Sequence, residues 1–523
     1  MNGIKSRKYK PRPGGERRVR ISVLLASIAM GAPPLAAGAQ SLPTTNVSDG
    51  PTQLSTTELS RIEVTGTAGQ YKIDAVQSPK FTQPLLDTPQ TIDVISSEVI
   101  QEQGAATLTE ALRNSPGVGT FYVGENGKTS TGDAVYMRGF DASGSIFVDG
   151  VRDLGSIARD TFDIEQVQVV KGPDGTVYGR TTPTGAINMV SKQALLSNGV
   201  SAKASYGISN QKRATADWNH VIGRHAAFRI NVMGQKSGVP GRDEVKNNRW
   251  GVAPSLAFGI DTPTRVCLNF LHVTHNNVPD GFVPTVGLPG YSTPDPARPF
   301  LSDAPKVDPS NFYGTDADHD HVKADMATLI VQHDFSDNLV LHDTLRWGRT
   351  YQNYLVTSWR STDKNLRTPD PTDTSTWTVA RSDPNFKDQL NRIFTNQANL
   401  TARFATGTVK HDLSAGIELT REQIRTVGIG ALNDSAWPPF NLYAPDRHVT
   451  GLIAGDTGIW SPVVAPIPQG STRSIRCTSV SVGCSRPAPA STTMTPAFAA
   501  WWVAVAKVRS PATTRRSALR CPV

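Results

Sequence analysis

The chain has 523 residues, of which 38% are hydrophobic and 19% are charged, and it holds 44 Gly and 37 Pro. This composition is too apolar for a disordered protein and too rich in turn residues for a helical bundle. The net charge of +8 lies at the two ends, because residues 1–40 and 461–523 are basic and the interior is acidic. A nucleic acid is therefore not expected as a partner.

The first 39 residues have the order of a secretory signal peptide. A basic segment ends at Arg20, an uncharged apolar run covers 21–35, and Ala37-Gly38-Ala39 follows. This order predicts export and cleavage before Gln40. Residues 40–80 are rich in Ser, Thr, Gly and Gln, and we expect them to form an extended leader.

Residues 81–195 predict a compact α+β unit. One helix is expected over 106–113, and it ends at the sequence Asn-Ser-Pro-Gly that follows. Glycine corners such as Asp149-Gly150 separate short apolar segments. These segments are expected to be strands over 91–95, 134–137, 145–148, 167–170 and 186–190.

Residues 196–458 alternate apolar and polar side chains between short turns. In 226–232, for example, Phe228 and Ile230 share one face and Arg229 the other. Such strands, with tight turns at one end and long connections over 276–315 and 361–389, are typical of an antiparallel transmembrane β-barrel. The fold class expected is therefore mainly β, with an α+β domain followed by a barrel. A soluble β-sandwich is the alternative, because the signal of each strand is weak.

Four stretches of residues 81–195 closely resemble the plug domain of TonB-dependent outer-membrane receptors. They are LLDTPQTIDVISSEVIQEQGA (85–105), LTEALRNSPGV (108–118), VYMRGFDASGSIFVDGVRD (135–153) and IEQVQVVKGPDGTVYGRTTPTGAINMVSK (164–192). The stretches 124–134 and 151–166 are most similar to the branch that imports ferric catecholate siderophores. The resemblance implies a plug domain inside a barrel of about 22 strands in the outer membrane of a Gram-negative bacterium. At about 20 residues per strand and connection, only about half of that barrel is present here.

The resemblance also implies an energy source. In this family a short extended segment, the TonB box, pairs with TonB, which acts with the ExbB/ExbD complex. Pairing of this kind adds a β-prone segment to the edge of a partner sheet. The corresponding residues of the periplasmic leader, at 62–67, are Ile62, Glu63, Val64, Thr65, Gly66 and Thr67.

The cargo implied is a ferric siderophore, with outer-membrane lipid around the barrel and with no cofactor, resident metal or catalytic residue. An anionic, aromatic ferric catecholate suits cations and aromatic or polar surfaces. A solvated loop charge is the alternative for each candidate. The candidate siderophore-binding residues are Tyr122, Glu125, Asn126, Lys128, Arg152 and Arg159.

Polar contacts are expected to hold the plug in the lumen. Arg138 and Arg180, at plug corners that match the family's motifs, are predicted to pair with barrel carboxylates as a latch. A capped local turn is the alternative for either arginine. On the barrel side, Arg229, Arg346 and Arg403 are among the side chains expected to face the lumen.

A run of acids and histidines, Asp316, Asp318, His319, Asp320 and His321, has the residue types of a metal site. Alternate spacing on a strand would divide these side chains between two faces, so we expect a solvated loop. The sequence lacks a His-Glu-x-x-His helix, a nucleophile elbow and a Cys-x-x-Cys pair, and an enzyme is not expected.

Residues 459–523 contain no Asp or Glu and show no sustained alternation. We interpret this segment as an aberrant basic tail that is disordered or frameshifted. Three hypotheses follow for the whole chain. It is a TonB-dependent active transporter of ferric siderophores that is truncated in this reading, a nonfunctional receptor remnant, or a secreted soluble β-protein.

Overall fold

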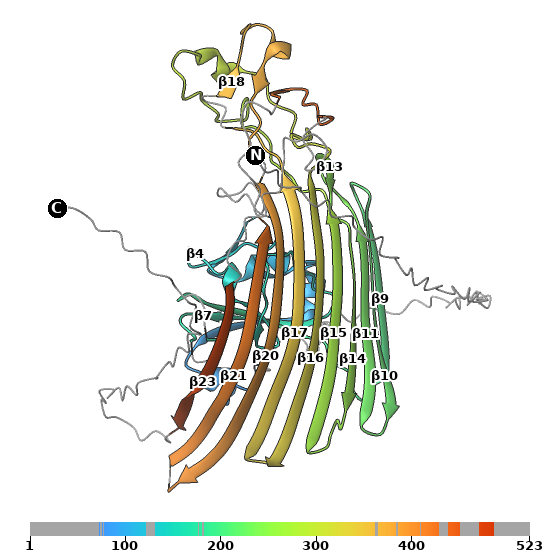
Figure 1. The fold of residues 1–523 in the computed structure, drawn as a ribbon, viewed down its shortest axis with the longest axis vertical. Helices are drawn as coiled ribbons and strands as arrows, with labels where there is room; N and C mark the ends of the chain where they lie inside the picture. Colours follow the sequence, from blue (N-terminus) through green and yellow to red (C-terminus); the bar gives the residue numbers. More distant parts are fainter. Residues whose placement is uncertain are drawn as a thin grey trace, which may run out of the picture. The chain divides into compact units, whose positions relative to one another are not determined.

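The computed structural model describes residues 73, 76, 78–121, 131–175, 177–179, 183–360, 365–382, 385–407, 409–427 and 438–449, and the backbone of 470–485. All of them belong to the compact unit Gly66–Val523. The structure has three parts, namely an N-terminal α+β domain, a long antiparallel sheet and a cluster of loops, formed by connections between strands, at one end of that sheet (Figure 1).

The N-terminal domain, called the plug below, is built on a five-stranded sheet with the order β1-β7-β8-β5-β6. Its side chains form a core in which Leu108, Val167 and Ile187 are fully buried. A second, small sheet contains β2, β3 and β4. The strands are β1 (Thr91–Ser96), β2 (Val118–Thr120), β3 (Val135–Met137), β4 (Phe140–Asp141), β5 (Ile146–Val148), β6 (Val151–Arg152), β7 (Ile164–Lys171) and β8 (Gly185–Ser191).

The predicted helix is present but shorter. A capping box between Thr107 and Glu110 starts α2 (Leu108–Ala111), and a 3₁₀ turn, η2 (Leu112–Asn114), continues it. The sequence analysis did not predict α1 (Ser97–Glu102), which Ser96 caps through a hydrogen bond from Val99 N. Short 3₁₀ turns also lie at η1 (Leu85–Asp87) and η4 (Ser143–Ser145).

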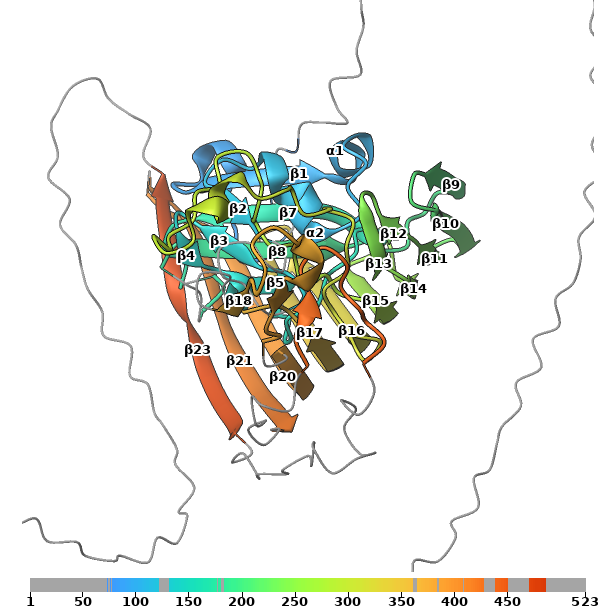
Figure 2. The same ribbon diagram turned by 90° about the horizontal axis from the view of Figure 1, so that it is seen from above.

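Ten antiparallel strands form one curved sheet, called the wall below, which partly surrounds the plug (Figure 2). Neighbours in sequence are neighbours in the wall, as expected for strands joined by tight turns. The strands are β9 (Gly199–Gly207), β10 (Gln211–Gly223), β11 (Ala226–Lys236), β14 (Arg249–Phe258), β15 (Thr264–Asn277), β16 (His319–Ser336), β17 (Leu339–Val356), β20 (Asn385–Thr406), β21 (Val409–Val427) and β23 (Gly470–Ser485).

The wall is polar inside and apolar outside. Its outward face exposes large apolar side chains at alternate positions, including Trp250, Leu268 and Trp347. The opposite face carries polar groups toward the plug, such as Arg346 and Asn391. This inverted pattern confirms the predicted barrel-type strands and disfavours the soluble β-sandwich, whose apolar face would be inside. Among the helices that the structure describes, none has the length and hydropathy needed to cross a bilayer.

One part of the tail, Gly470–Ser485, is a strand rather than disordered. This segment is β23, and its backbone pairs with β21 from Lys410↔Ser485 to Ile424↔Gly470, with one irregularity. The open edge of β21 offers backbone partners, and the β-branched residues of TRSIRCTSVSV suit an extended strand. The rest of 459–523 lies outside the described residues.

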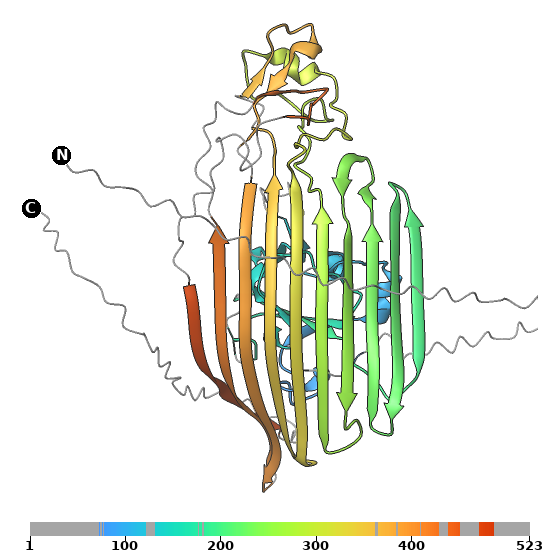
Figure 3. The ribbon, with the colours of Figure 1, turned by 45° about the vertical axis from the view of Figure 1, so that its right-hand side comes forward.

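Long connections at one end of the wall pack together into a loop layer (Figure 3). Trp377 and Tyr313 are buried at its centre, and the Arg381 guanidinium lies 5.2 Å from the ring centroid of Phe440. This layer contains η5 (Pro299–Asp303), η6 (Thr374–Thr376) and the three-stranded sheet of β18 (Leu366–Arg367), β19 (Thr378–Val379) and β22 (Phe440–Asn441). A two-stranded sheet, β12 (Gly238–Val239) and β13 (Arg242–Lys246), joins β11 to β14.

Candidate functional site at the interface of plug and wall

One buried ion pair joins a plug corner to β17. Asp149 has a φ of 48°, a left-handed conformation that Asp tolerates better than most residues. Its carboxylate accepts hydrogen bonds from Ser191 N (2.8 Å) and Ser191 Oγ (3.0 Å), and it pairs with Arg346 Nη2 at 2.9 Å. Arg346 also donates to Val148 O at 2.6 Å and to Thr328 Oγ1 at 2.8 Å. Both charged groups are therefore buried with several hydrogen bonds.

A second plug carboxylate, Asp160, lies between two arginines of the wall. Arg213 of β10 donates Nη2 to Oδ1 at 2.7 Å and Nη1 to Oδ2 at 2.9 Å. Arg249 Nε of β14 lies 3.1 Å from Oδ2. Burial raises the pKa of Asp160, but Arg249 and Arg213 outweigh burial and lower that pKa, so the group is a carboxylate at neutral pH.

A third charged cluster lies where the plug continues into the wall. Asp217 of β10 accepts from Lys192 Nζ at 3.1 Å and from Arg229 Nη2 at 2.7 Å. Arg229 Nη1 also lies 3.7 Å from Glu165 Oε2 of the plug. On β20, several strands away, Arg403 Nη2 donates to Thr82 O at 3.2 Å. Arg229, Arg346 and Arg403 thus contact the plug, as predicted.

The latch predicted at Arg138 is not observed. Arg138 is exposed in the turn between β3 and β4 with a φ of 51°, and its N–H donates to Gly117 O at 2.9 Å. No ion pair within the described ranges includes its side chain. Arg138 is a turn residue here, and the observed pairs at Asp149 and Asp160 have reversed polarity, with carboxylates on the plug and arginines on the wall. Arg180 lies outside the described residues.

Arg159, a predicted siderophore-binding residue, lies buried in an ion-pair network of the plug. Arg159 is 6% exposed, its Nε lies 2.7 Å from Asp153 Oδ2, and its Nη1 lies 3.1 Å from Asp133 Oδ2. Its Nη2 donates to Gly155 O at 2.9 Å. Burial lowers the pKa of Arg159, but Asp153 and Asp133 raise it by more. Arg159 is therefore a structural cation with its donors already used by the plug.

Arg152 is the described candidate that stays accessible. Its side chain is 32% exposed, with Nε donating to Gly144 O at 3.1 Å and Nη1 lying 4.0 Å from Glu422 Oε1 of β21. The other predicted siderophore-binding residues, Tyr122, Glu125, Asn126 and Lys128, lie outside the described residues, as do the predicted TonB-binding residues 62–67.

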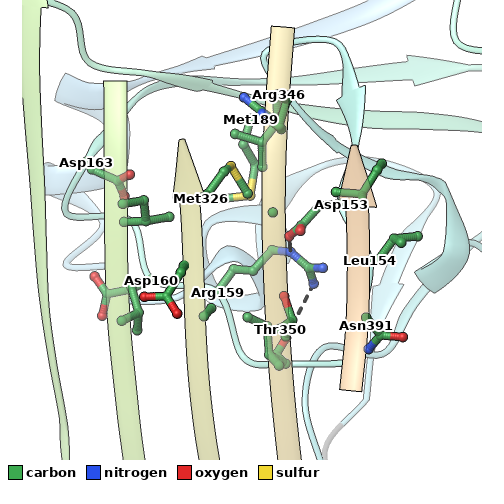
Figure 4. Close-up of a pocket in the computed structure, with 18 of the residues that line it drawn as sticks. Asp153, Leu154, Arg159, Asp160, Asp163, Met189, Met326, Arg346, Thr350 and Asn391 are labelled. Carbon is green, nitrogen blue, oxygen red and sulfur yellow. Dashed lines mark hydrogen bonds and ion pairs between the residues drawn. The ribbon is translucent and has the colours of Figure 1, made fainter. Parts of the chain in front are cut away.

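A cavity of about 50 Å³ lies between plug and wall (Figure 4). At about 10–15 Å³ per water, it has room for only a few water molecules and is too small for a siderophore. This part of the interface is therefore closed, whereas a larger cavity of about 340 Å³ lies between α1 of the plug and strands β9 and β10 of the wall. Residues that line this cavity include Leu154, Asp163, Met189, Met326, Thr350 and Asn391.

Asp163 beside this cavity predicts a pH-dependent stability. Burial, with a smaller contribution from Asp160, raises its pKa to about 7. The folded state therefore holds this proton more tightly than the unfolded state, so stability falls as pH rises from about 4 to 7 and stays low above pH 7. We expect D163N to match the parent near pH 4 and to be more stable at pH 8, by at most roughly 4 kcal/mol.

Unfolding in guanidinium chloride at pH 4 and pH 8 measures this difference. The matched control is D303N, because Asp303 is exposed in the loop layer. An equal free-energy difference between D163N and the parent at both pH values would show that Asp163 does not titrate in this range.

Asp318 and Asp320 are buried, so the expectation of a solvated loop is wrong for these two acids, whereas Asp316 is exposed as expected. Asp318 accepts from Thr357 N and Thr357 Oγ1, each at 2.7 Å. Asp320 accepts from Thr131 Oγ1 of the plug at 3.1 Å. His321, on the other face of β16, is exposed, as the alternation predicted. In the part of the chain that the structure describes, no group of three or more His, Cys, Asp or Glu could hold a metal ion.

The sequence analysis missed Asp149, Asp160, Arg213 and Arg249 as anchoring residues. Asp149 was noted only as part of a glycine corner. The available signal was the position of Arg213 and Arg249 on the polar face of alternating strands. Their partner Asp160 had no comparable signal, because it lies 53 positions from Arg213 in an irregular segment.

Comparisons with known proteins agree with this architecture. The TonB-dependent Receptor Plug Domain profile matches residues 84–186, within the expected range 81–195. The catecholate siderophore receptor Fiu of Escherichia coli K12 is 50% identical over 383 residues, which are 73% of this chain and 50% of Fiu. The crystal structure of Fiu in a closed form aligns with a TM-score of 0.70 and 48% identity over 75% of this chain and 54% of that chain.

The chain belongs to the TonB-dependent receptor family. A further structural relative is the siderophore receptor PiuA of Acinetobacter baumannii, with a TM-score of 0.62 and 27% identity over 78% of this chain and 56% of that chain. This TonB-dependent receptor chain spans about half the length of the curated relatives it matches. The relatives named here are receptors rather than enzymes.

Proposed function

We propose that the chain forms the plug and part of the wall of an outer-membrane receptor that imports ferric siderophores of the catecholate class. TonB, with ExbB/ExbD, supplies the force through residues 62–67. The observation that carries this proposal is that the wall exposes an apolar outward face and contacts the plug through ion pairs on its inner face. The apolar face suits lipid, and hydrogen-bonded contacts can exchange for water when a plug rearranges.

The catecholate class rests on the relative with 50% identity, which is described as a catecholate siderophore receptor. The chemistry of the plug is compatible with this cargo. Arg152 offers an accessible cation to an anionic ferric complex, and Tyr122 and Lys128 remain predicted contacts for its aromatic rings and charge. Arg159 is not part of this proposal because its donors are used within the plug.

Uptake of radioactive iron tests the proposal. The chain, joined to the C-terminal half of the Fiu barrel so that the wall can close, is expressed in an iron-starved Escherichia coli strain that lacks its own catecholate receptors, and ferric 2,3-dihydroxybenzoylserine is supplied. We expect uptake well above the empty-vector level, and we expect V64P to abolish it because proline removes a backbone donor from the strand added to TonB. T57P, which places proline in the leader outside residues 62–67, is the matched control and should keep full uptake.

The remnant hypothesis makes the opposite prediction. A chain that reaches the outer membrane but supports no uptake of any ferric catecholate would favour a nonfunctional remnant. Uptake that survives V64P would instead contradict the role assigned to residues 62–67. The secreted soluble β-protein is disfavoured by the exposed Trp250, Phe270 and Phe394 on the outward face of the wall.

A further inference from the structure

The outward face of the wall carries a basic patch near the loop layer. β17, β20 and β21 lie side by side there (Figure 3). Arg346 and Asn391 face the plug, so Arg349 and Arg392, an odd number of positions away, face outward, and both are exposed. The basic patch consists of Lys323, Arg349, Arg392, Arg421 and Arg425, all exposed.

Like charges stand opposite each other in the basic patch. Arg349 pairs with Arg392 directly across the ladder, where Cβ atoms are about 5 Å apart. Gln423 lies directly across from Arg392. Arg421 and Arg425, two positions before and after Gln423, are therefore the diagonal neighbours of Arg392, at roughly 7–8 Å. Directly opposed like charges destabilise a sheet. An anion between the guanidinium groups would remove this repulsion.

Carboxylates of the chain do not neutralise the basic patch. Asp325 lies across from Arg349, but its carboxylate is 2.6 Å from His272 Nδ1. Asp388 is the other acid on this part of the outward face. Within the described ranges, no ion pair includes a cation of the basic patch, so the patch keeps an excess of positive charge.

An apolar row lies directly beside the basic patch. This row runs across neighbouring strands through the paired residues Phe270, Ala327, Trp347 and Phe394. It lies one outward-facing position further from the loop layer than Arg349 and Arg392. The side chains of Phe270, Trp347 and Phe394 are 39%, 43% and 52% exposed. Aromatic side chains at this height are typical of the boundary between lipid chains and headgroups in a membrane barrel. The basic patch is therefore at the level of the headgroups.

We propose that the basic patch binds the phosphate groups of a phosphorylated lipid in the leaflet on the loop side. Arg349 and Arg392 donate paired hydrogen bonds to phosphate oxygens, and the neighbouring aromatic row contacts the acyl chains. This inference rests on the membrane location given under Proposed function. It is independent of the cargo, because the basic patch faces away from the plug.

Native mass spectrometry of the full chain in dodecyl maltoside micelles tests the proposal, with diphosphorylated lipid A as the probe. We expect the parent to retain the lipid and R349Q/R392Q to bind it about thirtyfold more weakly. R349K/R392K keeps the charge and should recover most of the binding. The matched control K306Q/R367Q removes two exposed cations from the loop layer and should bind like the parent.

Equal lipid retention by R349Q/R392Q and K306Q/R367Q would overturn the proposal. So would a parent that retains lipid A no better than phosphatidylcholine, or that binds inorganic phosphate as tightly as lipid A. Unchanged tryptophan fluorescence shows that each variant is folded. Iron uptake is measured separately, so loss of transport with lipid binding intact would count against the proposed function alone.

Discussion

Replacing Asp160 with asparagine is expected to lower the free energy of unfolding by about 3–5 kcal/mol. The carboxylate is the shared counter-ion of Arg213 and Arg249, whose side chains are 12% and 8% exposed. Asparagine keeps the shape but leaves two buried guanidinium groups without a negative partner. His275, across from Arg249 on β15, cannot replace the carboxylate because an imidazole carries no negative charge.

Chemical unfolding of the full chain in detergent, followed by tryptophan fluorescence, measures this loss. D337N is the matched control, because Asp337 is exposed in the turn between β16 and β17. The control should change stability by less than about 0.5 kcal/mol. A D160N variant as stable as D337N would mean that the two wall arginines find other partners or water.

Replacing Arg346 with methionine should have an effect of similar size, again about 3–5 kcal/mol. Arg346 is 1% exposed and fully surrounded by plug and wall, so its loss leaves the carboxylate of Asp149 buried beside an apolar chain. R346K should be only partly tolerated, since a lysine cannot reproduce the bonds to Val148 O and Thr328 Oγ1 together with the ion pair.

A double-mutant cycle separates the ion pair from packing. D149N removes the negative charge while asparagine still accepts the left-handed φ of 48°. We expect D149N/R346M to recover at least half of the stability lost in R346M, because no unpaired charge remains buried. If the stability lost in D149N/R346M equals the sum of the losses in D149N and R346M, Asp149 and Arg346 do not stabilise the structure as a pair.

The strands of the wall could be predicted from sequence because their alternation is local. Arg229 lies between Phe228 and Ile230, and the structure turns it toward Asp217 while both neighbours face outward. The short α1 had no such signal, because six residues are too few for a helical period to show. β23 was missed for another reason: its pairing depends on the free edge of β21, which is a property of the folded sheet.

The charged contacts were predicted in kind, but the pairs at Asp149 and Asp160 have the opposite polarity, whereas Lys192 and Asp217 pair with the predicted one. Arg346 and Asp149 are 197 positions apart, and no spacing rule connects residues at that distance. Arg138 attracted attention because it sits in a recognisable motif, yet its positive φ shows a role in the turn. Arg159 was assigned to the cargo because an anionic ferric complex suits a loop cation, but in the structure Arg159 is buried and paired with Asp133 and Asp153. Burial of a cation depends on acids brought in from elsewhere in the fold.

Under the proposed function, the contacts of the plug carboxylates Asp149 and Asp160 with wall arginines constrain how a passage can open. If the whole plug left the lumen, Arg213, Arg249 and Arg346 would all lose their counter-ions at once and line an empty channel with positive charge. A partial unravelling that keeps Asp149 and Asp160 in place avoids this electrostatic penalty. In a receptor of the proposed function, these anchors therefore favour local remodelling of the plug over its complete expulsion.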